Sequence, residues 1–596
     1  MEKKEAAKIS TLGYFRYFQN IVGIHIYGYL IINFLVGLLD GLGLAMFVPL
    51  LSIATGSTTN NESLGELEFL VTGIKQLGIE LNLATALGLM ISLFVLKGIF
   101  FYIRTIYFTK IRLVAIRKIR WNLLSGFKDL SYEGFTKLDA GRIQNNMIGE
   151  VDKLVNAMVT YFVSIQHVVM LLTYVVLAFL SNWQFAIMVG IGGGLTNIFY
   201  KYINKKTKEY SRKQSFVGHD FNGNLIQAIN NFKYLKATNY FKTYERKLKD
   251  NIWVSEDLNF RMGKIGAIAE SLREPMIIII IAMVILVQVN VMGGSFGSIL
   301  VSLLLFYRAL AHLVSMQNSW NNFMRTSAGL ESVEFILSEF KRYQEPKLQG
   351  EIQNISTIDT KDISITYGRT PILRNINISI SPKSSIALVG ESGAGKTTLA
   401  NVLCGLLPPH KGEVFMDGIS LYKSNLNSFR DKVGYITQEP VIFDDSIFNN
   451  VTFWAEKTPE NIGRFWNTME MVSMKTFVEG VENKENARLG NNGILVSGGQ
   501  KQRISIAREL YKEVELLVMD EATSALDSET EKHIKESIDM LQGKFTMIII
   551  AHRLSTVKNV DQVYLMEKGE IINHGTFGEL LNKSERFKKM VELQEV

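Results

Sequence analysis

The sequence predicts a fold in two parts, an all-α transmembrane domain of six helices at residues 1–345 fused to an α/β domain of the P-loop type at residues 346–596. Three observations support this prediction. The chain has 596 residues, more than one ordinary domain holds, and 47% of them are hydrophobic. Apolar stretches of about 20 residues, long enough to cross a bilayer, recur in the first part. From Ile352 onward, short strands and glycine-rich turns replace them.

Polar sections separate the apolar stretches. Basic residues gather after the second stretch, between Lys110 and Arg120, which is the positive-inside pattern and predicts that both chain ends lie in the cytoplasm. The net charge of +7 therefore indicates a membrane protein rather than a partner of nucleic acid. We expect an N-terminal elbow helix before residue 20 and an external amphipathic helix within residues 55–82. The six expected spans are residues 24–51, 83–108, 155–180, 185–202, 265–289 and 299–320.

A glycine-rich loop at residues 390–398 is the centre of the second domain. It reads Gly-Glu-Ser-Gly-Ala-Gly-Lys-Thr-Thr and lies between an expected strand, residues 385–389, and an expected helix, residues 399–407, as a phosphate-binding loop requires. Lys396 is expected to reach the terminal phosphates of a nucleotide and Thr397 to ligate magnesium, while the helix start adds partial positive charge. The residues expected at the phosphates are Gly390, Ser392, Gly393, Gly395, Lys396, Thr397 and Thr398.

Further polar side chains follow three other expected strands. These are Asp520 and Glu521 after residues 516–519, Gln438 after residues 433–437, and His552 after residues 545–550. Asp520 offers a carboxylate for magnesium, and Glu521 is placed to polarise water for attack on a phosphate. Ser497-Gly498-Gly499-Gln500 precedes a helical stretch and predicts a second anion-binding helix start.

In this order and spacing, the segment from Tyr367 to His552 resembles the nucleotide-binding domain of ATP-binding cassette (ABC) proteins. The resemblance implies ATP hydrolysis with Mg²⁺ as cofactor and a catalytic set of Glu521, His552 and Gln438. It assigns the remaining roles residue by residue: Tyr367 to adenine stacking, residues 390–398 to the Walker A loop, Asp520 and Glu521 to the Walker B pair, Gln438 to the Q-loop and a magnesium contact, Ser497 to Gln500 to the signature, residues 524–527 with Asp527 to the D-loop, and His552 to the switch.

The resemblance also implies a partner. In ABC exporters the signature of one copy faces the phosphate loop of another, and this chain has one of each, so a homodimer is expected. Residues 132–135 and 223–240 resemble the segments that couple the membrane domain to the ATPase. Two departures stand out: residues 490–493 lack the acidic residue usual ahead of the signature, and Val496 replaces the usual leucine.

Charged residues inside the expected spans predict a substrate cavity. They are Asp40, Lys97, Arg273 and Arg308. Such charges are costly in a bilayer, so we expect the cations to attract an anionic head group, with arginine favoured for its forked donors. The alternative is structural, with Asp40 and the acidic residues of the fifth span pairing with these cations and holding helices together.

The leading interpretation is an exporter or flippase of the bacterial plasma membrane that moves an amphipathic or anionic lipid-linked molecule, such as a lipid-linked oligosaccharide. Its other partners would be membrane lipids, with no nucleic acid. A multidrug, lipid or peptide exporter is the alternative, and a nucleotide-gated channel is a weaker one because it need not retain Glu521 and His552. Cys404, the one cysteine, is expected to be a small buried residue.

Overall fold

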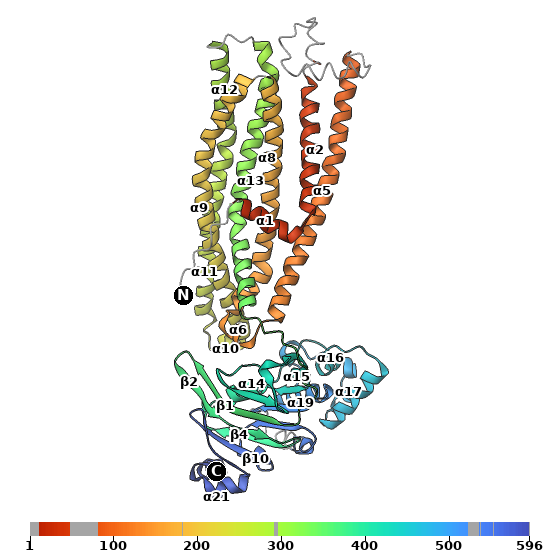
Figure 1. The fold of residues 1–596 in the computed structure, drawn as a ribbon, viewed down its shortest axis with the longest axis vertical. Helices are drawn as coiled ribbons and strands as arrows, with labels where there is room; N and C mark the ends of the chain where they lie inside the picture. Colours follow the sequence, from red (N-terminus) through yellow and green to blue (C-terminus); the bar gives the residue numbers. More distant parts are fainter. Residues whose placement is uncertain are drawn as a thin grey trace. The chain divides into compact units, whose positions relative to one another are not determined.

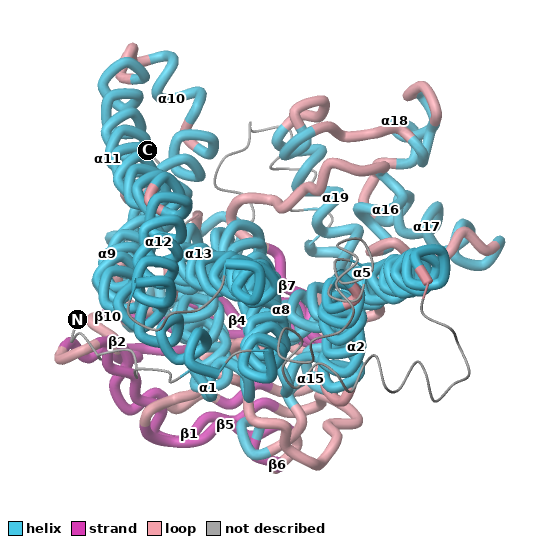
Figure 2. Tube along the Cα trace, turned by 90° about the horizontal axis from the view of Figure 1, so that it is seen from above, coloured by secondary structure: helices cyan, strands magenta, loops and turns pink. Residues whose placement is uncertain are grey.

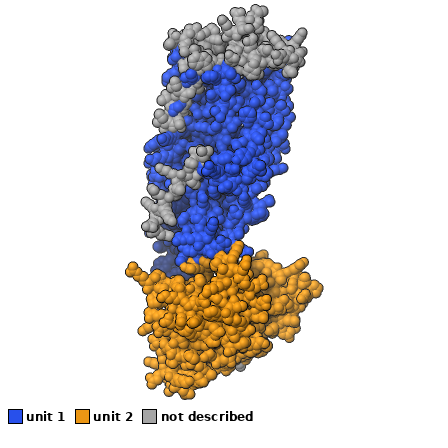
Figure 3. Space-filling view, viewed as in Figure 1, with its two compact units in different colours: residues 1–130, 134–344 blue, residues 131–133, 345–596 orange. Residues whose placement is uncertain are grey.

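The computed structural model describes two compact units of the chain. Unit 1 comprises residues 1–130 and 134–344, and unit 2 comprises residues 131–133 and 345–596 (Figure 3). The described residues are 11–47, 50, 82–181, 183–290, 296–521, 536, 538–551 and 553–594. The expected external helix of residues 55–82, apart from its last residue, and the expected D-loop with Asp527 and switch residue His552 lie outside them.

Unit 1 is a bundle of long helices. Its helices are α1 (Thr11–Val22), α2 (His25–Ala45), α5 (Leu83–Lys128), α6 (Tyr132–Lys137), α7 (Ala140–Asn145), the π-helix η3 (Asn146–Glu150), α8 (Val151–Ser181), α9 (Trp183–Asn230), α10 (Phe232–Ala237), α11 (Phe241–Ser271), α12 (Arg273–Asn290) and α13 (Phe296–Arg342). In both ribbon and tube views, α9, α11 and α12 gather on one side, α2 and α5 on the other, and α8 and α13 between them (Figures 1 and 2).

The short helix α1 packs against this bundle along one face. Tyr14, Phe18 and Val22, at the i, i+4 spacing of a helix face, are all buried. The Nζ of Lys118 in α5 donates to the backbone carbonyl oxygen of Asn20 at 3.0 Å, which satisfies an acceptor at the carboxyl end of α1. The sequence predicted an N-terminal elbow before residue 20, and the structure has a helix at residues 11–22.

Three stretches among the described helices are long and apolar enough to cross a membrane. They are His25–Ala45, Leu83–Lys128 and Ala140–Leu180. They contain the first three expected spans, apart from the end of the first, which falls partly outside the described residues. The expected count of six is therefore not confirmed by the described helices.

The fifth expected span, residues 265–289, is not one helix, which corrects the sequence prediction. The structure ends α11 at Ser271 and begins α12 at Arg273, with Leu272 between them. The physical reason is Pro275, which has no backbone N–H and whose ring would clash with the carbonyl of Ser271 four residues earlier. A proline fits the first turn of a helix, and here it fits the first turn of α12.

Unit 2 contains two sheets. The larger has six strands in the order β11-β10-β4-β9-β8-β7, and all but β11 are parallel to their neighbours. Its strands are β4 (Ser385–Gly390), β7 (Val433–Ile436), β8 (Leu516–Asp520), β9 (Thr546–Ile550), β10 (Gln562–Glu567) and β11 (Glu570–Gly575). The smaller sheet is formed by β1 (Ile358–Tyr367), β2 (Thr370–Ile376), β3 (Ser379–Ile380), β5 (Lys411–Met416) and β6 (Ile419–Ser420).

Helices cover this sheet system (Figure 1). They are α14 (Lys396–Leu403), α15 (Leu426–Arg430), α16 (Ile447–Thr452), α17 (Pro459–Met471), α18 (Lys475–Gly480), α19 (Gly498–Tyr511), α21 (Phe577–Lys583) and α22 (Glu585–Glu592). The alternation of side chains along a strand explains why the central strands are apolar throughout. In β8, Leu517 belongs to one hydrophobic core and Val518 to another, one on each face of the sheet.

Candidate functional site

The residues expected at the nucleotide come together because their strands belong to the parallel part of one sheet. β4, β7 and β8 run the same way, so the segments that follow them leave the same edge of the sheet. These segments carry the phosphate loop, Gln438 and Glu521, in agreement with the strand positions expected from the sequence. The carboxyl edge of a parallel sheet is where α/β proteins bind ligands.

The phosphate loop uses glycine where no side chain fits. Gly390 has φ of +154°, and a Cβ there would lie 2.2 Å from the carbonyl oxygen of Met566 in β10. Gly395 has φ of +99°, and its Cβ would lie 2.8 Å from the Cδ2 of Leu373. The loop is therefore bare backbone held tightly against β10 and β2, a shape whose N–H groups can surround phosphate oxygens.

Lys396 begins α14 inside this loop. Its Nζ donates to the carbonyl oxygens of Gly390 at 2.8 Å and Glu391 at 3.0 Å, and the residue is only 6% exposed. Burial lowers the pKa of the Lys396 ammonium, although the nearby carboxylates Glu521 and Asp520 act against this shift. The backbone carbonyls thus hold the Lys396 ammonium in position, and phosphate oxygens can replace them as its hydrogen-bond acceptors.

The two carboxylates at the end of β8 differ in surroundings. Burial and then the charge of Glu521 raise the pKa of Asp520, which accepts side-chain hydrogen bonds from Thr397 and Tyr435. Glu521 has φ of +48°, and its Oε2 accepts a hydrogen bond of 2.7 Å from the Nε2 of Gln438. The Asp520 carboxylate, Thr397 hydroxyl and Gln438 amide oxygen are hard donors of the kind magnesium takes, so the residues present fit that ion.

The signature and the adenine position are both exposed. Ser497 caps α19 in a reciprocal capping box, its hydroxyl accepting from the Gln500 backbone N–H at 3.3 Å while the Gln500 side chain accepts from the Ser497 N–H at 2.9 Å. Ser497 and Gly498 are exposed, as is Tyr367 at the end of β1 with 54% of its surface accessible. The exposed ring of Tyr367, in the same unit as the phosphate loop, can stack on a base.

Sequence reasoning missed two residues of this site. Tyr435 lies in β7, and its hydroxyl contacts Asp520, which orients a carboxylate expected to hold metal. Arg586 in α22 bridges Glu391 of the phosphate loop at 2.8 Å and Glu567 of β10 at 2.5 Å. Tyr435 could have been suspected from its place three residues before Gln438, whereas nothing in the sequence ties Arg586 to a loop 195 residues away.

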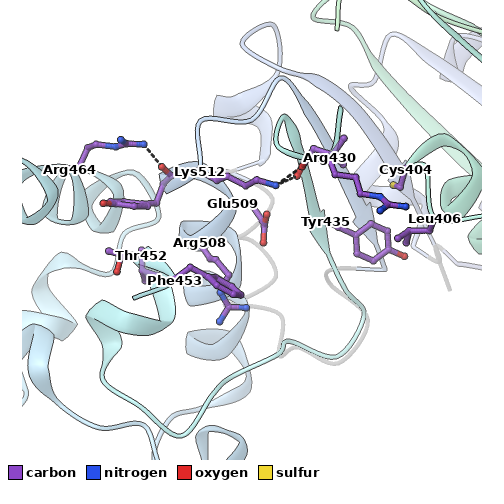
Figure 4. A pocket seen from close by; sticks show the side chains of 13 residues that line it. Cys404, Leu406, Arg430, Tyr435, Thr452, Phe453, Arg464, Arg508, Glu509 and Lys512 are labelled. Atoms are coloured by element: carbon purple, nitrogen blue, oxygen red, sulfur yellow. Dashed lines mark hydrogen bonds between the residues drawn. The ribbon is translucent and has the colours of Figure 1, made fainter. Parts of the chain in front are cut away.

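A cavity of about 590 Å³ in unit 2 shares only Tyr435 with the site residues named above (Figure 4). None of the phosphate-loop residues 390–398 lines it. Its cations are tied to backbone carbonyls: Lys512 Nζ donates to Arg430 at 2.6 Å and Val433 at 2.8 Å, and Arg508 Nε to Asn450 at 2.7 Å. Cys404 lines it and is a buried free thiol, as expected.

The charged residues expected in the membrane cavity are not equivalent. Asp40 of α2 is buried, and its Oδ1 lies 2.5 Å from the Nζ of Lys97 in α5, while its Oδ2 accepts 2.5 Å from the hydroxyl of Tyr174 in α8. For Lys97, this pairing favours the alternative in which the intramembrane charges hold helices together rather than bind substrate. Arg308 of α13 is exposed. The side chain of Arg273, the first residue of α12, lies outside the described part of the chain.

The fold and this site define an ATPase joined to a membrane-embedded helical bundle, and family comparisons agree. Residues 373–524 match the family model described as ABC transporter, and residues 26–313 match the model described as ABC transporter transmembrane region. The chain belongs to the ABC transporters, in which ATP hydrolysis is coupled to transport.

The chain is similar to named relatives and to a solved structure. It is 27% identical over 541 residues, 86% of each chain, to the ATP-dependent lipid A-core flippase of Francisella tularensis subsp. tularensis (strain FSC 198). It is 28% identical over 477 residues to the protein of the same name in Paraburkholderia xenovorans (strain LB400), covering 75% of this chain and 76% of that one. A solved bacterial Atm1-family ABC exporter with ATP bound shares its fold, with a TM-score of 0.79 and 21% identity over 96% of this chain and 98% of the other.

Proposed function

We propose that the chain is a homodimeric ATP-driven exporter or flippase of the bacterial plasma membrane, with both ends in the cytoplasm, and that it moves an anionic lipid-linked molecule such as a lipid-linked oligosaccharide. The observation that supports ATP hydrolysis by unit 2 is that four polar side chains lie together at one edge of the larger sheet. They are Lys396, Gln438, Asp520 and Glu521. The names of its relatives, ATP-dependent lipid A-core flippases, support a glycolipid class of substrate.

Each residue of the site has one task. Lys396 and the loop amides would hold the phosphates of ATP. Thr397 and Asp520 would hold magnesium, which would neutralise charge on the transferring phosphate. Glu521 polarises the attacking water. Gln438 donates to Glu521 at 2.7 Å, so a bound nucleotide that draws the Gln438 amide away frees the Glu521 carboxylate for that water.

A second copy completes the site. The signature helix start at Ser497 is exposed and capped within its own helix, with backbone N–H groups available to an outside anion. In the homodimer, Ser497 and Gly499 of one copy close over the phosphates held at Lys396 of the other. Shifting the dimer from a 1:99 to a 99:1 ratio of closed to open conformations takes about 5.5 kcal/mol of differential binding. Two nucleotides shared between the copies can supply this free energy.

Arg308 is the cation we assign to the substrate. Lys97 is neutralised by Asp40 at 2.5 Å, whereas Arg308 is exposed on α13 and free to turn its planar donors to a phosphate. A dimer doubles this charge. A multidrug, lipid or peptide exporter remains the second candidate, since apolar residues make up much of the surrounding helices.

Reconstituted full-length protein tests the proposal through substrate-stimulated ATPase activity. We expect lipid-linked oligosaccharide to stimulate hydrolysis and the free oligosaccharide to do so weakly, because the lipid and phosphate are missing. Arg308→Gln should raise the half-stimulating concentration about tenfold, since one charge-assisted hydrogen bond to a phosphate is lost. Basal ATPase should stay unchanged.

Arg325→Gln is the matched control, because Arg325 is an exposed arginine on the same helix. It should respond to the glycolipid as the unmodified protein does. Stimulation by drugs or peptides with no response to lipid-linked glycans would favour the second candidate instead.

A further inference from the structure

A buried polar network ties together the helices at the end of unit 1 that carries α7. Its centre is Glu150, the last residue of the π-helix η3, with no exposed surface. Its Oε1 accepts from Lys153 Nζ at 2.9 Å and from Asn145 Nδ2 at 3.2 Å, and its Oε2 accepts from the Ser215 hydroxyl at 3.0 Å. π-helices cost regular hydrogen bonding and recur at functional sites.

Glu150 fixes which way the amide of Asn145 points. The Asn145 Nδ2 lies 3.2 Å from the Glu150 carboxylate, and its Oδ1 accepts from Asn222 Nδ2 at 2.8 Å. Turning the amide over would place its oxygen against the Glu150 oxygen, acceptor against acceptor. The network therefore assigns the nitrogen of Asn145 to the side that faces Glu150 and His219.

The orientation of Asn145 in turn fixes the tautomer of His219 in α9. The Asn145 Nδ2 lies 2.8 Å from the Nδ1 of His219, so this ring nitrogen must accept. The Nε2 of His219 lies 3.2 Å from the hydroxyl of Ser332 in α13, which itself donates to Asn146 at 3.0 Å. Every bond is satisfied when His219 is neutral with its proton on Nε2.

A second proton on His219 breaks this pattern. It would put an N–H on Nδ1 and two donors 2.8 Å apart, so the contact from α9 to α7 must open. Burial lowers the pKa of His219, which shows the same preference for the neutral ring. The charged groups that act on it are Glu150 of η3 and Asp220 of α9, which attract the proton, and Arg142 of α7 and Lys153 of α8, which repel it.

The surroundings leave little room for the network to adjust. From α13, Glu331 does not turn to His219 but bonds Lys208 and Arg212 of α9 at 3.0 and 2.7 Å. Beside the network, the backbones of α7 and α9 nearly touch, because a Cβ on Gly141 would lie 2.4 Å from the Cα of Gly223. Movement of α7 away from α9 is therefore the available response.

We propose that His219 is a proton-binding site that locks α7 to α9 and α13 when neutral and releases α7 when protonated. The lock is complete above the ordinary histidine pKa of about 6.5 and is lost as the pH falls through and below that value, because the released form binds the proton better. The ligand is a proton, and the elements it controls are α7 and η3.

Hydrogen exchange of the full-length protein tests this proposal. Backbone protection of residues 140–150, corrected for intrinsic exchange, is measured at about pH 8 and about pH 5, the range in which a histidine changes charge. In the unmodified protein we expect protection to fall about tenfold in acid, the factor that one buried hydrogen bond contributes to an opening equilibrium. In His219→Gln we expect protection at both pH values, because the amide can still accept from Asn145 and donate to Ser332 without titrating.

A second variant keeps the test decisive if His219→Gln folds poorly. Asn145→Asp replaces the donor by a carboxylate, which pairs with protonated His219 and repels Glu150, so the acid response should reverse sign. His574→Gln, an exposed histidine of unit 2, is the control and should behave as the unmodified protein. The proposal is overturned if His219→Gln loses protection in acid as the unmodified protein does, or if Asn145→Asp leaves the sign unchanged.

Discussion

Replacing Glu521 by glutamine is expected to slow ATP hydrolysis by about 10²–10⁴-fold, the range that a positioned general base contributes. The amide keeps the size of the carboxylate and its place at the end of β8, but it cannot take a proton from water. ATP binding should remain, because Lys396 and the glycine backbone of the loop are untouched. Phosphate release and nucleotide binding, measured on the same preparation, separate the two effects.

Two variants of nearby side chains test the role of Glu521 further. Gln438→Glu would place two carboxylates where the structure has a 2.7 Å hydrogen bond, and it should weaken magnesium-dependent activity without removing the base. Glu391→Gln, which removes the exposed carboxylate bound by Arg586, should retain most activity. Hydrolysis by Glu521→Gln at the unmodified rate would exclude Glu521 as the base.

The same variant tests the dimer. When Glu521→Gln chains are mixed with unmodified chains before reconstitution, turnover should fall below the value expected from the fraction of active chains, because each mixed pair contains a blocked site that holds its ATP. Proportional loss would mean that each chain works alone.

Removing the carboxylate of Asp40 is expected to destabilise unit 1 strongly. Asp40→Asn leaves the Lys97 ammonium without the charge of its 2.5 Å partner. Because Asp40 is buried and Lys97 only partly exposed, we expect a cost of about 2 kcal/mol. The Lys97 Nζ also lies 5.3 Å from the ring centre of Phe94, a cation–π contact that offsets only part of this loss. Thermal unfolding of the purified protein measures the loss.

A double variant separates structure from substrate binding. In Asp40→Asn with Lys97→Met, no charge remains to be paired, and the asparagine oxygen can still accept from Tyr174, so stability should return to within about 1 kcal/mol of the original. If the pair is only structural, stimulation by substrate returns as well. Recovery of stability without stimulation would assign Lys97 to the substrate.

The strands around the candidate nucleotide site could be predicted closely from sequence because their signals are local. The strand, loop and helix around Lys396 follow one another along the chain, and the apolar runs 516–519 and 545–550 coincide with β8 and β9 to within a residue. Because the strands of such a sheet are parallel, their carboxyl ends lie at one edge, so the strand positions alone predict which residues come together. The described strands confirm these positions, whereas the helix expected at residues 399–407 is α14 at Lys396–Leu403, which begins three and ends four residues earlier.

Contacts between distant segments could not be predicted in the same way. Asp40, Lys97 and Tyr174 come from three helices, and the charges alone did not decide whether they pair or bind substrate. The network around His219 depends on a π-helix, and no pattern in residues 146–150 distinguishes it from an α-helix. The break at Leu272 had a visible signal in Pro275, but the apolar residues that follow it gave the appearance of one continuous span.

The interruption at Leu272 has a mechanical consequence. A continuous helix resists bending because each turn must stretch its hydrogen bonds, whereas at this joint Pro275 has already left one carbonyl without an intrahelical donor. The angle between α11 and α12 can therefore change with little further loss of backbone hydrogen bonds. If α11 and α12 bend during a transport cycle, we expect the bend to be localised at Leu272 and the helical turns on either side to stay regular.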